Sequence, residues 1–306
     1  MKKVYKFFMT FLPVLLCGIG LNVIFSVVAY GLDFDKVSAT YKFPATTTIL
    51  FFVFLGFSVG FAFYFSANAK HLYITKIRKK SNFLKLSSWL AASVLIFLFL
   101  VETARLVAFD HIADPAKFDG WRIARYVLTI PFAAYFIIMV FPTKIKKKKI
   151  IIPNAIKYIL DIVAIAWCIV SVFSFYFYDK LTITNSFMIW EIVLYTIAAL
   201  FFVFEARFEH LKANNFLYVL FASLLCIVSF TYSISSIIAL SSNFFQVNTY
   251  SSEPQLLADF GIGLYALARL YAIPKTMKHV MDNDDSGSFS SKFNKQPDDF
   301  ASDDDE

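Results

Sequence analysis

Long apolar runs recur along the chain, and short polar segments separate them. A helix that crosses about 30 Å of hydrocarbon needs about 20 predominantly apolar residues. Eight runs meet this length, at residues 7–32, 46–69, 86–109, 122–142, 156–178, 187–204, 216–241 and 256–274. The pattern predicts an all-α fold, a polytopic integral membrane bundle of about eight transmembrane helices.

The lysines and arginines between these runs predict the orientation of the bundle. If the N-terminus is cytoplasmic, the cytoplasmic segments hold nineteen lysines and arginines. The external segments hold only four, namely Lys36, Lys42, Lys117 and Lys180. Positive residues remain preferentially on the cytoplasmic side during insertion. We therefore expect both termini inside, in a multi-pass protein of the cytoplasmic (inner) membrane.

Composition supports a membrane protein and argues against a soluble one. Hydrophobic residues make up 58% of the chain and charged residues 17%. A soluble domain of this composition would expose large apolar patches and aggregate. The net charge of +7 does not indicate nucleic-acid binding, because the lysines lie in short loops. We expect the lipid bilayer, and no nucleic acid, as a partner.

The end of the chain differs in composition from the rest. Residues 282–306 contain nine acidic residues against Lys292 and Lys295. Such a segment has too little apolar surface to offset the entropy lost on ordering. The sequence thus predicts two parts, a transmembrane bundle at 1–281 and a disordered acidic cytoplasmic tail at 282–306.

Ionisable residues within or beside the apolar runs are the candidate functional residues. Charges in a bilayer are costly and usually face the bundle interior in pairs. At 1.5 Å per residue, Glu102 lies about 24 Å from the cytoplasmic end of its run, in the outer leaflet. The other charged residues fall at a similar predicted depth. The full candidate set is Glu102, Arg105, Arg122, Arg125, Glu191 and Asp259.

This set suggests a polar cavity open to the outside. Arginine suits a carboxylate or phosphate, because its planar fork donates two parallel hydrogen bonds. Arg105, Arg122 and Arg125 would then bind an anionic group. The alternative is a structural ion-pair network, with residues such as Arg122 and Glu191 merely extending to the interface.

Small residues indicate where helices approach closely. Residues Ala222, Cys226, Ser229, Ser233 and Ser236 form a stripe on the seventh run. Such a stripe is more typical of a packing seam than of a solute path. Gly56 and Gly60 form a GxxxG pattern on the second run and also predict close packing.

Charged residues also occur towards the cytoplasmic ends of the runs. Asp161 and Arg269 fall in the cytoplasmic half and can pair across the bundle. Residues 205–210, a charged stretch after the sixth run, are expected to form a cytoplasmic turn.

No recognisable catalytic, metal or cofactor motif accompanies these charges. The four histidines lie near loops or membrane boundaries, and there is no HExxH. His111 with three nearby aspartates matches no established metal site. We therefore expect no metal and no cofactor, and the residues favour a protein that is not an enzyme.

Three classes of function remain. The first is transport or sensing of a small anionic or zwitterionic solute through an outward-facing polar cavity. The second is a non-catalytic membrane subunit or anchor, with another membrane protein as partner. The third is a membrane-embedded enzyme that acts on a lipid-linked substrate. The arginine and carboxylate set favours the first.

Overall fold

The computed structural model describes twelve stretches of the 306-residue chain. They are residues 2–32, 34–35, 40–41, 46–69, 81–108, 120–140, 144–145, 148–149, 153–178, 186–209, 214–241 and 253–285. The structural statements below concern these residues.

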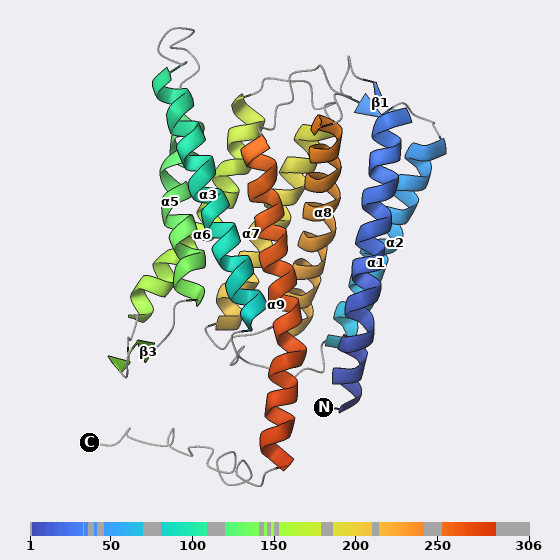
Figure 1. The fold of residues 1–306 in the computed structure, drawn as a ribbon, viewed down its shortest axis with the longest axis vertical. Helices are drawn as coiled ribbons and strands as arrows, with labels where there is room; N and C mark the ends of the chain where they lie inside the picture. Colours follow the sequence, from blue (N-terminus) through green and yellow to red (C-terminus); the bar gives the residue numbers. More distant parts are fainter. Residues whose placement is uncertain are drawn as a thin grey trace, which may run out of the picture.

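Eight long helices dominate the described part and confirm the predicted bundle (Figure 1). Each is long and apolar enough to cross a membrane. Their bounds are α1 (Lys2–Leu32), α2 (Thr46–Ala69), α3 (Asn82–Ala108), α5 (Gly120–Val140), α6 (Asn154–Tyr178), α7 (Ser186–Glu209), α8 (Asn215–Ser241) and α9 (Glu253–Asp285). The chain is thus a multi-pass membrane protein.

Polar residues directly before two helices define where they begin. Ser81 accepts the backbone N–H of Leu84 on its Oγ at 3.1 Å, at the start of α3. Asn214 accepts the N–H of Leu217 on its Oδ1 at 3.2 Å, at the start of α8. These side chains satisfy backbone donors that the first helical turn leaves without a partner.

The helices alternate in direction, so α1 begins and α9 ends on the same side of the bundle (Figure 1). We call this the terminal side and the opposite one the distal side. On the terminal side, β3 (Lys144–Ile145) pairs antiparallel with β4 (Lys148–Lys149) between α5 and α6. On the distal side, β1 (Phe34–Asp35) pairs with β2 (Thr40–Tyr41). The lysine distribution predicts that the terminal side is cytoplasmic.

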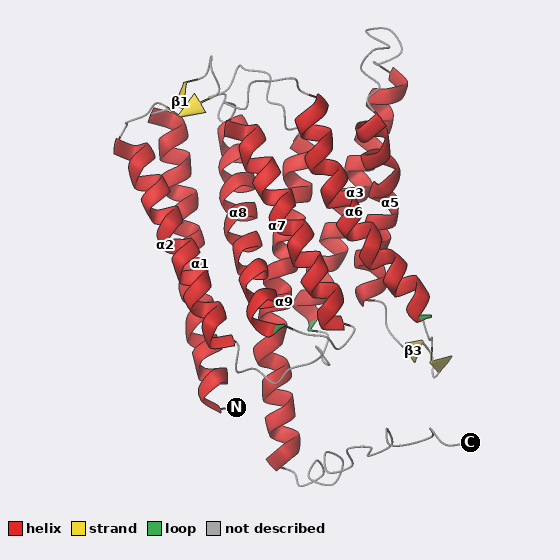
Figure 2. Ribbon diagram, turned by 180° about the vertical axis from the view of Figure 1, so that it is seen from behind, coloured by secondary structure: helices red, strands yellow, loops and turns green. Residues whose placement is uncertain are grey.

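Six of the helices form a closed ring. Neighbours in it are α3, α5, α6, α7, α8 and α9, and α9 packs back against α3. The α1–α2 pair lies outside this ring and packs mainly on α8 (Figures 1 and 2). Helices α8 and α9 are the most buried spans, at 78% and 72%. The interior of the ring is therefore where buried polar groups can gather.

Large apolar side chains cover the outside of the bundle. Phe57, Leu86 and Trp89 are among the most exposed, at 72%, 66% and 55%. Such a surface would aggregate in water, whereas hydrocarbon solvates it. This outward apolar face is what contact with a lipid bilayer requires.

Helices α8 and α9 approach closely along the small-residue stripe of α8. Cys226 Sγ donates to the carbonyl of Gly263 at 3.6 Å, and Ser229 Oγ donates to that of Asp259 at 2.6 Å. A Cβ on Gly263 would lie 2.6 Å from Ser229 Cβ. The packing-seam interpretation is thus confirmed at Cys226 and Ser229.

The GxxxG prediction is wrong. A Cβ added at Gly56 or Gly60 would meet no atom within 4 Å in the described part. Close helix approach occurs instead at two glycines of α9, Gly263 against Ser229 of α8 and Gly261 against Ala91 of α3. Helix α9 is packed between other helices, whereas α2 lies at the edge.

Replacing Gly263 by alanine is expected to destabilise the bundle by about 1–3 kcal/mol, because the new methyl overlaps Ser229 and forces α8 and α9 apart. The matched control is Gly60→Ala, which should be neutral within about 0.5 kcal/mol or slightly stabilising. Unfolding by SDS in mixed micelles measures both. Equal stability of the two variants would contradict the close α8–α9 contact.

One predicted turn needs correction. Helix α7 continues to Glu209, so Glu205 is a fully buried helical residue and not part of a cytoplasmic turn. Its ion pair with Arg269 explains why a charge is tolerated there. Helix α9 ends at Asp285. The division into a bundle at 1–281 and a disordered tail at 282–306 stays a prediction, because residues 286–306 lie outside the described residues.

Candidate functional site

A small pocket lies between α3 and α5 in the distal half of the bundle. Its lining residues are Leu98, Phe99, Glu102, Arg122, Arg125, Tyr126 and Thr129. The space between these residues accommodates about one water molecule. In this conformation the pocket is narrow.

One ion pair ties the two walls of the pocket together. Arg122 Nη2 lies 3.3 Å from Glu102 Oε2, and their side chains are 19% and 12% exposed. Tyr126 stacks on Phe99, with ring centroids 4.5 Å apart, and its hydroxyl lies 2.9 Å from that of Thr103. These contacts hold α3 and α5 in register around the pocket.

Arg125 is the second cation that lines the pocket. Its guanidinium lies over the ring of Phe175, 5.0 Å from the centroid. Within the described part of the chain it makes no hydrogen bond and no ion pair. A guanidinium carries five N–H donors, so Arg125 presents a charge and a hydrogen-bonding fork that the protein leaves unsatisfied.

Thr129, which lines the pocket, is in contact with side chains in the interior of the helix ring. Thr129 Oγ1 accepts the indole N–H of Trp167 at 3.0 Å and donates to the carbonyl of Arg125 at 2.8 Å. Trp167 is fully buried and packs edge-on against Tyr195 at 5.4 Å. The pocket thus adjoins a wall of aromatic side chains.

A buried group of acceptors lies at the same level on α9. Asp259 Oδ1 accepts from Tyr195 Oη and from Gln255 Nε2, the latter at 3.2 Å. Asp259 and Gln255 are 0% and 2% exposed. Among the described residues, Asp259 Oδ2 and Gln255 Oε1 have no hydrogen-bond partner. Arg125 is close enough to Asp259 for an electrostatic interaction.

Glu191 lies nearby on α7 and is also buried. Tyr232 of α8 donates to its Oε1 at 2.9 Å. It interacts electrostatically with Tyr195, one turn further along α7. Glu191 thus belongs to the bundle interior and does not extend to the membrane interface.

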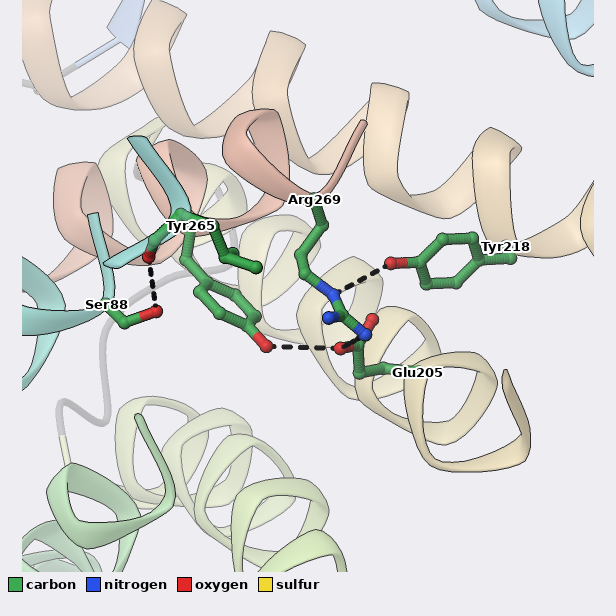
Figure 3. Close-up of polar contacts among 6 residues, drawn as sticks. Ser88, Glu205, Tyr218, Tyr265 and Arg269 are labelled. Carbon is green, nitrogen blue, oxygen red and sulfur yellow. Dashed lines mark hydrogen bonds and ion pairs between the residues drawn. The ribbon is translucent and has the colours of Figure 1, made fainter. Parts of the chain in front are cut away.

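A second buried cluster lies in the terminal half of the bundle (Figure 3). Arg269 of α9 forms an ion pair with Glu205 of α7 and donates from Nε to Tyr218 Oη at 3.2 Å. Tyr265 donates to Glu205 Oε1 at 3.1 Å. Since both charges are desolvated, their hydrogen bonds and mutual attraction keep them tolerable in the bilayer.

Aromatic side chains fill the interior of the helix ring between the distal polar groups around Asp259 and the terminal cluster around Arg269. Asp259 and Arg269 are ten residues apart on α9, about 15 Å along the axis. Buried rings occupy the interval on three helices, and they contact one another. They are Phe132, Tyr135, Phe136, Phe201, Phe202 and Tyr265. The distal and terminal clusters are therefore separate sites.

The structure brings together part of the predicted set. Glu102, Arg122 and Arg125 line one pocket. Glu191 and Asp259 lie deeper, between α7, α8 and α9. Arg105 lies on α3, but its side chain is outside the described part.

Sequence reasoning missed the neutral members of the site. The contacts between Arg125 and Asp259 run through Phe175, Tyr195 and Gln255. The chain has 38 Phe and 16 Tyr, so a single aromatic residue does not stand out in the sequence. Gln255 was detectable as a polar residue one turn before Asp259, on the same helix face.

No family model, curated protein or solved structure matches this chain. The described residues contain no group of three His, Cys, Asp or Glu side chains that can hold a metal ion.

Proposed function

We propose that this multi-pass membrane protein recognises a small anionic or zwitterionic solute, for transport or for sensing, in the distal pocket between α3 and α5. Arg125 is its principal ligand. The observation that carries this proposal is the guanidinium of Arg125, which lines the pocket without a hydrogen bond or ion pair from the described residues.

An anionic group fits this guanidinium for an electrostatic reason. A charge within a membrane protein costs several kcal/mol unless it is paired. Arg122 meets this requirement through Glu102. Arg125 lies over the face of Phe175 and interacts with Asp259 only at longer range, without an ion pair. A carboxylate or phosphate would satisfy Arg125 through two parallel hydrogen bonds.

The pocket geometry also supports a binding site over a purely structural network. In such a network each charge is matched by an opposite one within the bundle. The Glu102–Arg122 pair has this character and supports the wall. Arg125 stands apart from this pair, because it lines the pocket without a hydrogen bond or ion pair from the described residues.

The small volume of the pocket limits the size of the solute. Space for about one water means that α3 and α5 must separate slightly, or that side chains must turn, before a solute enters. Small solutes require the least rearrangement. Low-molecular-weight carboxylates, amino acids and inorganic phosphate are thus the appropriate probes.

Replacing Arg125 by glutamine is expected to weaken the affinity for the probe that the wild-type protein binds best by about tenfold or more. The measurement is calorimetric titration in nanodiscs with acetate, propionate, glycine, β-alanine, succinate and inorganic phosphate. Arg125→Lys should restore binding in part, because it keeps the charge but not the fork.

The matched control is Arg207→Gln. Arg207 also lies over a phenylalanine ring, that of Phe204 at 5.8 Å, but at the terminal end of α7. Its replacement should leave binding unchanged. If none of the probes binds the wild-type protein, or if Arg125→Gln binds as tightly as wild type, the proposal is refuted. Uptake of the bound probe into proteoliposomes separates transport from sensing.

A further inference from the structure

The buried acceptors on α9 are a feature that a purely anionic solute leaves unused. Asp259 Oδ2 and Gln255 Oε1 are shielded from solvent and have no hydrogen-bond partner in the described part. Buried acceptors without a donor are rare, since each costs free energy. The two atoms lie one helical turn apart on the same face of α9, so one donor group can reach both.

These acceptors are connected to the pocket through a row of packed side chains. The ring of Phe175 lies under the Arg125 guanidinium and stacks on Tyr195 with centroids 5.7 Å apart. Tyr195 in turn donates to Asp259. The row crosses from α5 through α6 and α7 to α9. A single aromatic side chain, Phe175, contacts both the pocket arginine and the tyrosine that holds Asp259.

The residues at the two ends of this row, Arg125 and Asp259, carry opposite charges but are not in direct contact through an ion pair. Arg125 and Asp259 interact electrostatically, yet they form no ion pair. A simple anion on Arg125 would neutralise the arginine and leave Asp259 with the unsatisfied Oδ2. A solute with a positive group at its other end would satisfy both residues and add no net charge to the membrane interior.

We propose that the solute is a zwitterion, a small amino acid whose carboxylate binds Arg125 and whose ammonium group binds Asp259 Oδ2 and Gln255 Oε1. This inference rests on the proposed function. An ammonium group has three N–H donors and no acceptor, so it matches a site whose two free atoms are acceptors. Tyr195 and Gln255 Nε2 orient the carboxylate of Asp259 by donating to its other oxygen.

A metal cation fits these acceptors less well. Hard cations such as Ca²⁺ take about six to eight oxygen ligands. The site offers two unpartnered oxygens, and the positive charge of Arg125 is nearby. A primary ammonium group needs fewer acceptors, and it arrives with the carboxylate that Arg125 requires.

The test compares solutes that differ only in the amino group. The pairs are glycine with acetate, β-alanine with propionate, and γ-aminobutyrate with butyrate, titrated into the full-length protein in nanodiscs. In at least one pair the zwitterion is expected to bind the wild-type protein about tenfold more tightly than the plain carboxylate. Equal binding within every pair would overturn the inference while leaving the proposed function intact.

Asp259→Asn is expected to remove this preference selectively. The variant keeps the shape and the contacts to Tyr195 but lacks the negative charge, so the zwitterion should lose about tenfold or more in affinity. Binding of the plain carboxylate should be retained. Gln255→Leu should weaken the preference less. Asp161→Asn, a buried acid-to-amide change on α6 in the terminal half, is the matched control and should leave it unchanged.

The outcomes separate the two proposals. A preference that survives Asp259→Asn contradicts the inference alone. Absence of binding in every pair contradicts the proposed function and the inference with it. If Asp259→Asn does not fold, Asp259→Glu keeps the charge at a changed distance, and its selectivity within each pair should fall. The wild-type comparison decides independently of any variant.

Discussion

Replacing Glu205 by leucine should lower the free energy of unfolding by about 3–5 kcal/mol, one of the two largest effects that we expect in this protein. Glu205 is fully buried and forms an ion pair with Arg269. Leucine would leave the guanidinium of Arg269 in the bundle interior without its counter-charge. It would also remove an acceptor from Tyr265. Unfolding by SDS in mixed micelles measures the loss.

Two further variants test the physical cause. Glu205→Leu combined with Arg269→Met should regain more than half of the loss, because apolar residues of similar volume often replace a buried ion pair at little cost. Glu102→Leu is the matched control, since its partner Arg122 is 19% exposed and can reach water. It should cost less than about 1 kcal/mol. A double variant no more stable than Glu205→Leu would contradict this explanation.

Replacing Trp167 by alanine should destabilise the protein by about 3–5 kcal/mol as well. The indole is fully buried in the ring, stacks on Phe132 with centroids 4.6 Å apart, and donates to Thr129. Alanine would leave a large cavity beside the distal pocket and an unpaired Thr129 acceptor. Stability in mixed micelles should therefore fall sharply.

Trp89→Ala is the control for this variant. Trp89 lies on α3 and is 55% exposed on the lipid-facing surface. Its removal leaves no internal cavity, so the expected loss is about 0.5 kcal/mol or less. Similar losses in the two variants would mean that the interior of the ring is not packed around Trp167.

The number of helices was predictable from the sequence because apolar length alone decides whether a segment crosses a bilayer. The ends of the helices were harder to predict. An apolar run ends at a charged residue, but a helix can continue past it. Helix α7 continues past Glu205 because Arg269, far along the chain, neutralises this charge. Only the tertiary contact reveals that this charge is interior.

The sequence predicted which charged residues lie at the candidate site, but not which side chains contact one another there. Depth along each run placed Glu102, Arg122 and Arg125 at one level, and they do line one pocket. Depth says nothing about which helix face a residue occupies. The sequence therefore did not indicate that Glu102 pairs with Arg122 while Arg125 remains available, nor that Phe175 and Tyr195 connect Arg125 to Asp259.

The separation of the two polar clusters has a functional consequence. In the terminal cluster the two charges are paired, Tyr265 donates to Glu205, and Arg269 donates to Tyr218. The distal half contains a cation and acceptors that are not matched to each other. A ligand gains most where the protein leaves hydrogen bonds unsatisfied, and this is why we propose that the solute binds in the distal half.

The most direct test of this account is the distance between a bound solute and Arg125. Solid-state NMR in lipid bilayers can measure dipolar coupling between the ¹³C-labelled carboxylate of the best-binding amino acid and ¹⁵N-labelled arginine guanidinium groups. The account predicts a coupling typical of hydrogen-bonded contact in the wild-type protein and in Arg207→Gln. Bound solute with no such coupling in the wild-type protein would contradict it.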